Sequence, residues 1–221
     1  MTGGGSSSSS NDGGNGSASN ALEEAAAAGV RTALDEAWRR PAIAARLSGA
    51  QVTSLCVVLQ RVCRLGAPPP SPAFIEVVWK RLAVLAQQQQ RAWQREQGAL
   101  QRQELQPEPQ PGGAGVAEVL SAEQLAVCLF CLAVYPGTPQ PRLLGMALAA
   151  AAGGAGRLDS TGVWRLASAV NAWAPRVRGR PPRQAAALVE ALAATAAARC
   201  AQLEPRALSA VAQSCSAAGL G

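Results

Sequence analysis

The chain of 221 residues contains no histidine and a single lysine, Lys80, and its aromatic residues amount to only 4%. Without histidine the protein lacks the commonest general base and the commonest metal ligand of enzymes. Its carboxylates are scattered and lie mostly at the starts of predicted helices, so no nucleophile–base pair can be assembled from them. These absences argue against an enzyme and against a cofactor, a bound metal or a small-molecule substrate.

Long hydrophobic runs and strand patterns are missing as well. No apolar run free of charge reaches the roughly 18–20 residues that a membrane span requires, so no membrane association is expected. Period-2 alternation of β-branched and aromatic residues, which is typical of half-buried strands, does not occur. Alanine, the best helix former, dominates the 48% of residues that are hydrophobic, and it indicates an all-α fold of closely packed helices.

Six cysteines are present, and no secretory signal segment precedes them. We therefore expect free thiols in a reducing compartment. Cys128 and Cys131 have the CxxC spacing of zinc and redox motifs, but no second CxxC and no histidine supplies further ligands. Since both lie among leucine, valine and phenylalanine in a predicted helix, we interpret them as packing residues.

A short motif recurs four times, beginning at Leu47, Leu120, Leu158 and Leu203. Each copy has a leading leucine, then serine, aspartate or glutamate, then apolar residues at helical spacing. The copies begin 73, 38 and 45 residues apart, and such periods are the mark of stacked helical hairpins. The motif predicts a short α-solenoid of antiparallel helix pairs with a repeat of about 38 residues.

The composition divides the chain into four segments. Residues 1–20 form a Gly/Ser-rich tail that cannot bury enough apolar surface to fold, so we expect it to be disordered. Residues 21–85 hold the N-terminal helices and the first repeat. Residues 86–119 are a Gln-, Pro- and Gly-rich insertion or linker, whose helical first part is expected to reach Leu105 and to project into solvent or fray. Residues 120–221 hold repeats two, three and half of four, so we expect the chain to be a fragment of a longer array.

Numbering each copy from its leading leucine separates two sets of positions. Positions 6, 9 and 13 are apolar in every copy and are assigned to the core. Positions 7, 8, 11 and 14 change from copy to copy and are assigned to the outer face of the first-helix row, the usual ligand surface of a solenoid. The third copy places a stacking ring, a cation and an amide there, in Trp164, Arg165 and Asn171.

The net charge of +6 is concentrated in the parts that carry the motif. Residues 31–81 and 157–221 carry +5 each, whereas residues 1–30 carry −3 and residues 82–156 carry −1. A basic surface suggests a polyanionic partner, and arginine can both stack on bases and pair with phosphate. A solvated basic face without a partner is the alternative that charge alone leaves open.

The segment LSGAQVTSLCVVLQRVCRLGAPPPSPAFIEVVWKRL, which begins at Leu47, resembles the octotricopeptide repeats of green-algal organelle proteins. Those repeats are helix pairs of about 38 residues with a Leu-rich first helix, a Gly-Pro-Pro turn and an apolar second helix. The repeats of FAST-kinase-like, RAP-domain proteins are similar, and the resemblance covers residues 47–85 and 120–221. It implies sequence-selective RNA binding in a chloroplast or mitochondrion. The first arginine is Arg31, so no clear transit peptide is present, and a cytoplasmic location is the alternative.

Repeat proteins that bind single-stranded RNA read each base with two or three side chains of one repeat. The candidate base contacts at the outer positions are Thr53, Ser54, Trp164, Arg165, Ser168, Asn171 and Gln213. The candidate phosphate contacts near the motif turns are Arg61, Arg64, Arg176, Arg178, Arg180 and Arg183.

The alternative function is an α-solenoid scaffold that binds proteins and no nucleic acid, because helical arrays bind peptides and partner helices as readily. In that case the Gln-rich residues 87–106 would form a helical arm for a partner. Trp93 and Leu100, seven residues apart on one face, would be its anchors.

Overall fold

The architecture is that of a computed structural model of the chain. It describes residues 46–66, 70–105, 120–135, 139–176 and 183–218, together with parts of 21–36. The tail predicted to be disordered, residues 1–20, lies outside the described residues, as do residues 106–119 of the predicted insertion.

The described part of the chain is all-α, as the sequence predicts, and it contains no strand. The helices between residues 46 and 218 are α3 (Gly49–Arg64), α4 (Pro72–Leu105), α5 (Ala122–Ala133), α6 (Pro141–Gly154), α7 (Ser160–Trp173), α8 (Arg183–Ala198) and α9 (Pro205–Ala218). Two single turns of 3-10 helix, η1 (Ala155–Arg157) and η2 (Cys200–Gln202), follow α6 and α8. The four motif copies form α3, α5, α7 and α9.

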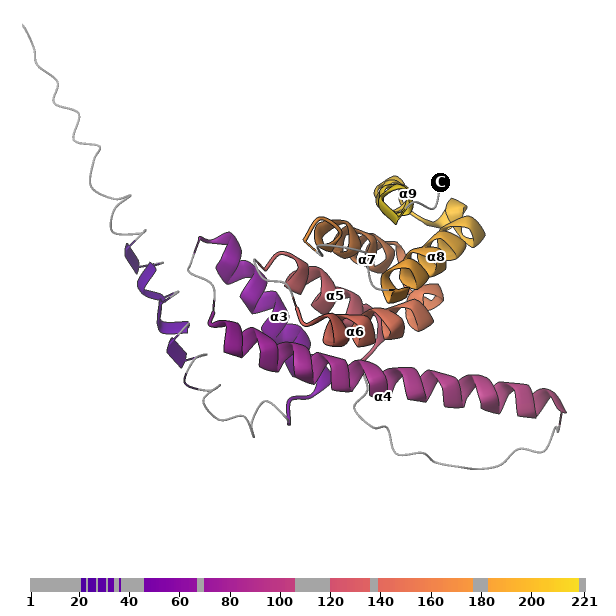
Figure 1. Ribbon diagram of the computed structural model, residues 1–221, viewed down its shortest axis with the longest axis horizontal. Coiled ribbons are helices and arrows are strands. Elements are labelled where there is room, and N and C mark those ends of the chain that lie inside the picture. Colours follow the sequence, from indigo (N-terminus) through magenta and orange to yellow (C-terminus); the bar gives the residue numbers. More distant parts are fainter. Residues whose placement is uncertain are drawn as a thin grey trace, which may run out of the picture.

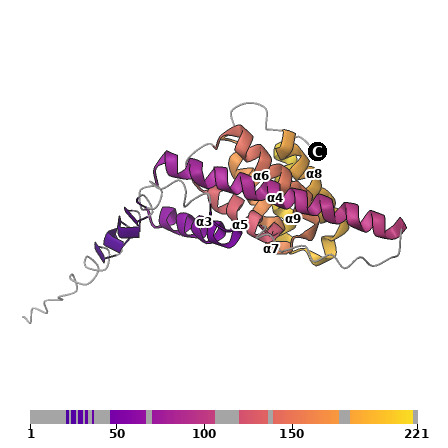
Figure 2. The same cartoon turned by 90° about the horizontal axis from the view of Figure 1, so that it is seen from below.

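The helices lie in two layers. The helices that carry the motif pack side by side in the order α3, α5, α7, α9, and the intervening helices pack in the order α4, α6, α8. The two layers touch through α3 with α4, α5 with α6, α7 with α8, and α8 with α9. Helices α3 and α9 lie at opposite ends of the motif layer (Figure 1), and α4 runs along the other layer (Figure 2). Segments far apart in sequence are thereby brought onto one surface.

Local sequence explains where the motif helices begin. Ser48 and Ser121 are N-caps whose side chains accept the main-chain N–H three residues later, and the glutamines at those positions return a bond to the cap N–H. These capping boxes satisfy donors that a helix start leaves unpaired. In α7 the cap is Asp159, whose carboxylate accepts the N–H of Gly162 at 2.6 Å. The leading leucine therefore stands just outside each of these three helices.

Arginines of the second layer anchor two of the leading leucines. The Arg81 guanidinium donates to the carbonyl oxygen of Leu47, with its Nε at 2.8 Å. The Arg199 guanidinium donates to the carbonyl oxygen of Leu158 at 2.7 Å. Arg81 lies in α4, which follows α3, and Arg199 comes directly after α8, which follows α7. The first and third copies therefore share this tertiary contact as well as the sequence motif.

The core follows the predicted register. Of positions 6, 9 and 13, the buried members are Val52, Leu59, Leu125, Cys128, Leu132, Val163, Leu166, Val170 and Val211. The remaining members, Leu55, Leu208 and Cys215, are half-buried. These three lie on α3 and α9, the end helices of the layer, where one neighbour is missing among the described residues.

Helix α4 departs from the expectation of a solvated insertion. It is one continuous helix to Leu105, as predicted, and it is the longest helix drawn in Figure 1. Its Trp93 is buried against Gly154 of α6. The Arg157 guanidinium lies 5.5 Å from the centre of the Trp93 ring and pairs with the Glu96 carboxylate at 2.8 Å. No helix within the described ranges is long and apolar enough to cross a membrane.

The buried ring of Trp93 corrects the interpretation of residues 87–106 as an arm for a partner. Trp93 is an internal contact between α4 and α6, so it cannot anchor a second protein. Gln89, also buried, completes this contact. With its amide oriented to satisfy both neighbours, Gln89 donates to the Leu120 carbonyl and accepts the indole N–H of Trp93. The first part of the predicted insertion therefore packs on α6 through Trp93 and holds the leading leucine of the second copy, Leu120, through Gln89.

Candidate nucleic-acid interface

The outer positions of the motif helices divide into two groups in the structure. Positions 8 and 11 lie at the surface or half-buried in α3, α5 and α7, as expected. In α3, α5 and α7, positions 7 and 14 instead face the next motif helix. In α5 they are Ala126 and Ala133, which are 0% and 1% exposed. The expectation that all four positions face solvent is therefore wrong for positions 7 and 14 of α5, because a helix in the middle of a layer has neighbours on two sides.

Two of the predicted base contacts are engaged in helix packing. Thr53 donates to the carbonyl of Gly49 at 2.8 Å, and its hydroxyl lies 3.6 Å from the thiol of Cys128 on α5. Asn171 donates to the carbonyl of Ala210 at 3.3 Å and accepts the hydroxyl hydrogen of Ser214 at 3.0 Å, both on α9. Both ends of the Asn171 amide are thus occupied by protein, and we remove both residues from the candidate base contacts.

An aromatic pair with an arginine lies across three motif helices. The ring centres of Phe130 on α5 and Trp164 on α7 are 5.0 Å apart, with the planes inclined by 49°. The guanidinium carbon of Arg206 on α9 lies 5.3 Å from the centre of the Trp164 ring. Trp164 is half-buried, which fixes its ring while leaving part of it accessible. Arg206 also pairs with Glu204 at 2.6 Å, so its charge is partly balanced.

Positive charge spans the same helices. Burial of the Cys131 thiol on α5 raises its pKa to about 11, while the charges of Arg165 and Arg64 act in the opposite direction. The guanidinium groups of α3 and α7 are therefore both within electrostatic reach of one thiol of the helix between them. Arg64 is exposed and Arg165 half-buried, so both charges reach the surface, and Arg165 directly follows Trp164 in α7. Cys131 itself is only 4% exposed and contributes no reactive thiolate.

The remaining base candidates lie on these helices at different depths. Ser54 on α3 and Gln213 on α9 are exposed, and Ser168 on α7 is half-buried. All three remain accessible to a ligand that crosses the motif layer.

The structure leaves some of the predicted phosphate contacts exposed and engages another in a helix cap. Arg61 and Arg64 are exposed in the last turn of α3, and Arg183 is exposed at the first residue of α8. Arg176 instead donates to the carbonyls of Ala133 at 2.7 Å and of Tyr135 at 2.9 Å, and so caps the C-terminal end of α5. We remove Arg176 from the phosphate contacts. Arg178 and Arg180 lie outside the described residues.

Sequence reasoning missed Phe130 and Arg206 as members of this surface. Phe130 occupies the outer position 11, but it is apolar and was assigned no role. Arg206 occupies position 4, which the register did not mark as outer. Only the offset between neighbouring helices, which brings position 4 of α9 beside position 7 of α7, reveals the contact with Trp164.

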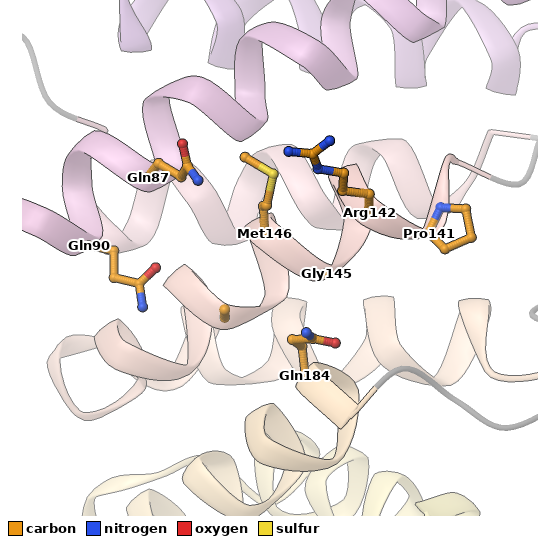
Figure 3. A pocket seen from close by; sticks show the side chains of 8 residues that line it. Gln87, Gln90, Pro141, Arg142, Gly145, Met146 and Gln184 are labelled. Carbon is orange, nitrogen blue, oxygen red and sulfur yellow. The ribbon is translucent and has the colours of Figure 1, made fainter.

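The second layer has a groove of about 260 Å³ between α4, α6 and α8. Figure 3 shows the amides of Gln87, Gln90 and Gln184 around it, together with Arg142 and Met146. Amides and one guanidinium can donate and accept hydrogen bonds, but its lining contains no carboxylate, thiol or hydroxyl side chain for acid–base or nucleophilic chemistry.

Cys128 and Cys131 are buried between α5 and its neighbours, so the packing interpretation of the CxxC spacing is confirmed. Cys131 donates weakly to the side-chain oxygen of Gln60 on α3 at 3.5 Å. In the part of the chain that the structure describes, no three cysteine, aspartate or glutamate side chains are grouped to hold a metal ion.

Comparison with known proteins gave no match to a family model, to a curated protein or to a solved structure. The resemblance to octotricopeptide repeats stays a prediction from the motif itself.

Proposed function

We propose that the chain is an RNA-binding α-solenoid, built from repeats of about 38 residues, that acts in RNA processing, stability or translation in a chloroplast or mitochondrion. The observation that carries the proposal is Trp164, held between Phe130 and Arg206 on the motif layer, with Arg165 next to it in α7 and Arg64 exposed on α3. Proteins that bind single strands combine aromatic rings on which bases stack with a positively charged track for the backbone. The organelle assignment rests on the resemblance alone.

The proposed contacts are those that the protein leaves accessible. A base would stack at the exposed part of Trp164, next to Arg165, which can stack or donate to a base edge. Ser54, Ser168 and Gln213 would supply hydrogen bonds at the other copies. Phosphates would meet Arg61 and Arg64 at the end of α3 and Arg183 at the start of α8.

Fluorescence anisotropy with a mixed pool of short single-stranded RNAs tests this function. Replacement of both Trp164 and Arg165 by alanine should weaken binding about 10- to 100-fold, because one stacked base contributes about 1–3 kcal/mol and one charge is lost with it. The matched control is Arg142→Ala with Val84→Ala, which removes one charge and one exposed apolar side chain from the second layer. It should leave the affinity unchanged.

Thermal unfolding followed by circular dichroism should show that both double variants are folded. Absence of RNA binding by the wild-type chain at about 50 mM salt, where electrostatic contacts are strongest, would reject the proposal. Equal affinities of the two double variants would reject the site.

A further inference from the structure

Helix α3 carries an apolar stripe on the side that faces away from α5. Leu55, Val58, Val62 and Leu65 recur at intervals of three and four residues, which places them on one face. Val58 is 39% exposed and Leu65 is 74% exposed. The opposite face contacts α5 through Thr53 and Gln60. Because α3 lies at one end of the motif layer (Figure 1), the stripe is an apolar surface at that end.

The stripe occupies the positions that are covered in the other motif helices. Leu55 and Val58 are positions 9 and 12 of the first copy. In α5 these positions are Cys128 and Cys131, which are buried against Thr53 and Gln60 of the preceding motif helix, α3. In α9 position 12 is Ser214, whose hydroxyl lies 3.0 Å from Asn171 of α7. The stripe is therefore the face on which a preceding helix docks.

Part of the chain before α3 is helical and has a matching face. Among residues 21–36, those that the structure describes are helical, and Leu22 and Val30 are 76% and 42% exposed. Leu22, Ala26, Gly29 and Ala33 are spaced by four, three and four residues and share one face. Their small side chains would let this helix approach the branched side chains of the stripe closely.

The charges of the two helices are complementary. Helix α3 contains no acidic residue and exposes Arg61 and Arg64 beside Leu65. Residues 21–36 contain four acidic side chains at their two ends and one basic side chain, namely Glu23, Glu24, Asp35 and Glu36 against Arg31. Acidic residues at both ends are attracted to the positive end of α3 whichever way the helix runs.

We propose that the apolar stripe of α3 is the docking surface for the helix 21–36 of the same chain. A second copy of the chain fits less well, because two α3 helices would bring like charges together. One 16-residue helix also falls short of the 800 Å² or so that each partner of a stable dimer buries. The helix 21–36 needs less contact area, since its covalent link gives a millimolar effective concentration. The connection 37–48 reaches about 40 Å when extended, more than the helix length of about 24 Å.

Hydrogen exchange of the full chain, read by mass spectrometry, tests the proposal. In the wild type, amides of 21–36 should exchange at least tenfold more slowly than in the variant Val58→Glu/Leu65→Glu, which places charge on the stripe. Val84→Glu is the control, since Val84 is 43% exposed on α4, away from the stripe. It should leave the exchange of 21–36 unchanged, and amides of α5, α7 and α8 should stay protected in all three proteins.

Three outcomes would overturn the proposal. The first is exchange of 21–36 in the wild type at the rate of an unstructured peptide. The second is protection of 21–36 that survives the stripe variant. The third is a dimer, seen by light scattering, that the stripe variant dissociates, because a second copy would then cover the stripe.

Discussion

At the scale of single residues, arginines that look equivalent in the sequence have two different roles. Arg81, Arg176 and Arg199 donate to main-chain carbonyls at the ends of helices. Arg61 and Arg64 keep their charge at the surface, where a phosphate could meet it. Charge counting cannot separate these roles, because the carbonyl partners lie about 34 to 43 residues away in sequence. The sequence therefore overestimated the basic surface.

At Gly154 a neighbouring aromatic ring leaves no room for a side chain. A Cβ at this position would lie 2.8 Å from the Cζ3 atom of Trp93. Gly154→Ala should therefore lower the free energy of unfolding by about 1–3 kcal/mol, because a rigid, buried ring must move. Urea unfolding followed by tryptophan fluorescence measures this.

Gly156→Ala is the control, since a Cβ there would meet nothing within 4 Å. Its stability should stay within about 0.5 kcal/mol of the wild type or rise slightly, because alanine restricts the unfolded chain. Equal effects of the two substitutions would show that Trp93 does not pack on α6.

The buried thiol of Cys131 should make the protein less stable at alkaline pH. Burial raises the pKa of Cys131 to about 11 from an ordinary value of 9.0, so the folded state keeps a proton that the unfolded state releases. This contribution to stability is complete below pH 9 and is lost as the pH rises toward 11. The urea midpoint should fall between pH 8 and 10.5, and it should fall less in Cys131→Ala. Parallel pH curves for the two proteins would contradict the assignment.

At the scale of helices, the local sequence accounts well for where each motif helix begins. The residue that follows the leading leucine in the first three copies, Ser48, Ser121 or Asp159, is the N-cap of the motif helix. Capping depends on residues within three positions of each other, so a single sequence contains the whole signal. The packing of the extended α4 depends on Gly154, about 60 residues away from Trp93, and could not be predicted locally.

The cap of α5 gives a quantitative test. Ser121→Ala should lower the free energy of unfolding by about 0.5–2 kcal/mol, because the N–H of Gln124 loses its acceptor and the capping box is broken. Chemical unfolding curves of the full chain provide the measurement. Ser209→Ala, at an exposed position inside α9, should change stability by less than about 0.5 kcal/mol. A silent Ser121→Ala would mean that the helix start is stabilised from elsewhere.

At the scale of the whole molecule, the motif layer places residues of four copies on one surface. Phe130 of the second copy, Trp164 of the third and Arg206 of the fourth are in contact across α5, α7 and α9. Arg64 of the first copy is exposed at the end of α3. Such a surface suits an extended ligand that crosses several helices in succession. The apolar stripe at its α3 end shows that the layer is open to a further helix on that side.

An extended polyanion would make binding depend steeply on salt. If Arg61, Arg64 and Arg183 each meet a phosphate, the logarithm of the RNA binding constant should fall with the logarithm of salt with a slope of about −2, from −0.7 per phosphate. Arg64→Ala should reduce the slope by about 0.7, and Arg142→Ala on α6 should not change it. Anisotropy titrations from 50 to 200 mM salt measure the slope, and a value near zero would exclude the phosphate track.

The sequence by itself determined the helical class, the helix starts and the apolar register of positions 6, 9 and 13, since these follow from neighbours within one or two turns of helix. The tertiary structure decided which polar outer positions stay accessible. Thr53, Asn171 and Arg176 were predicted to meet RNA, yet they bond to neighbouring helices, whereas Phe130 and Arg206 joined Trp164 unpredicted. The reason is physical: periodicity shows which residues share a face of one helix, but the offset and order of packed helices decide what each face meets.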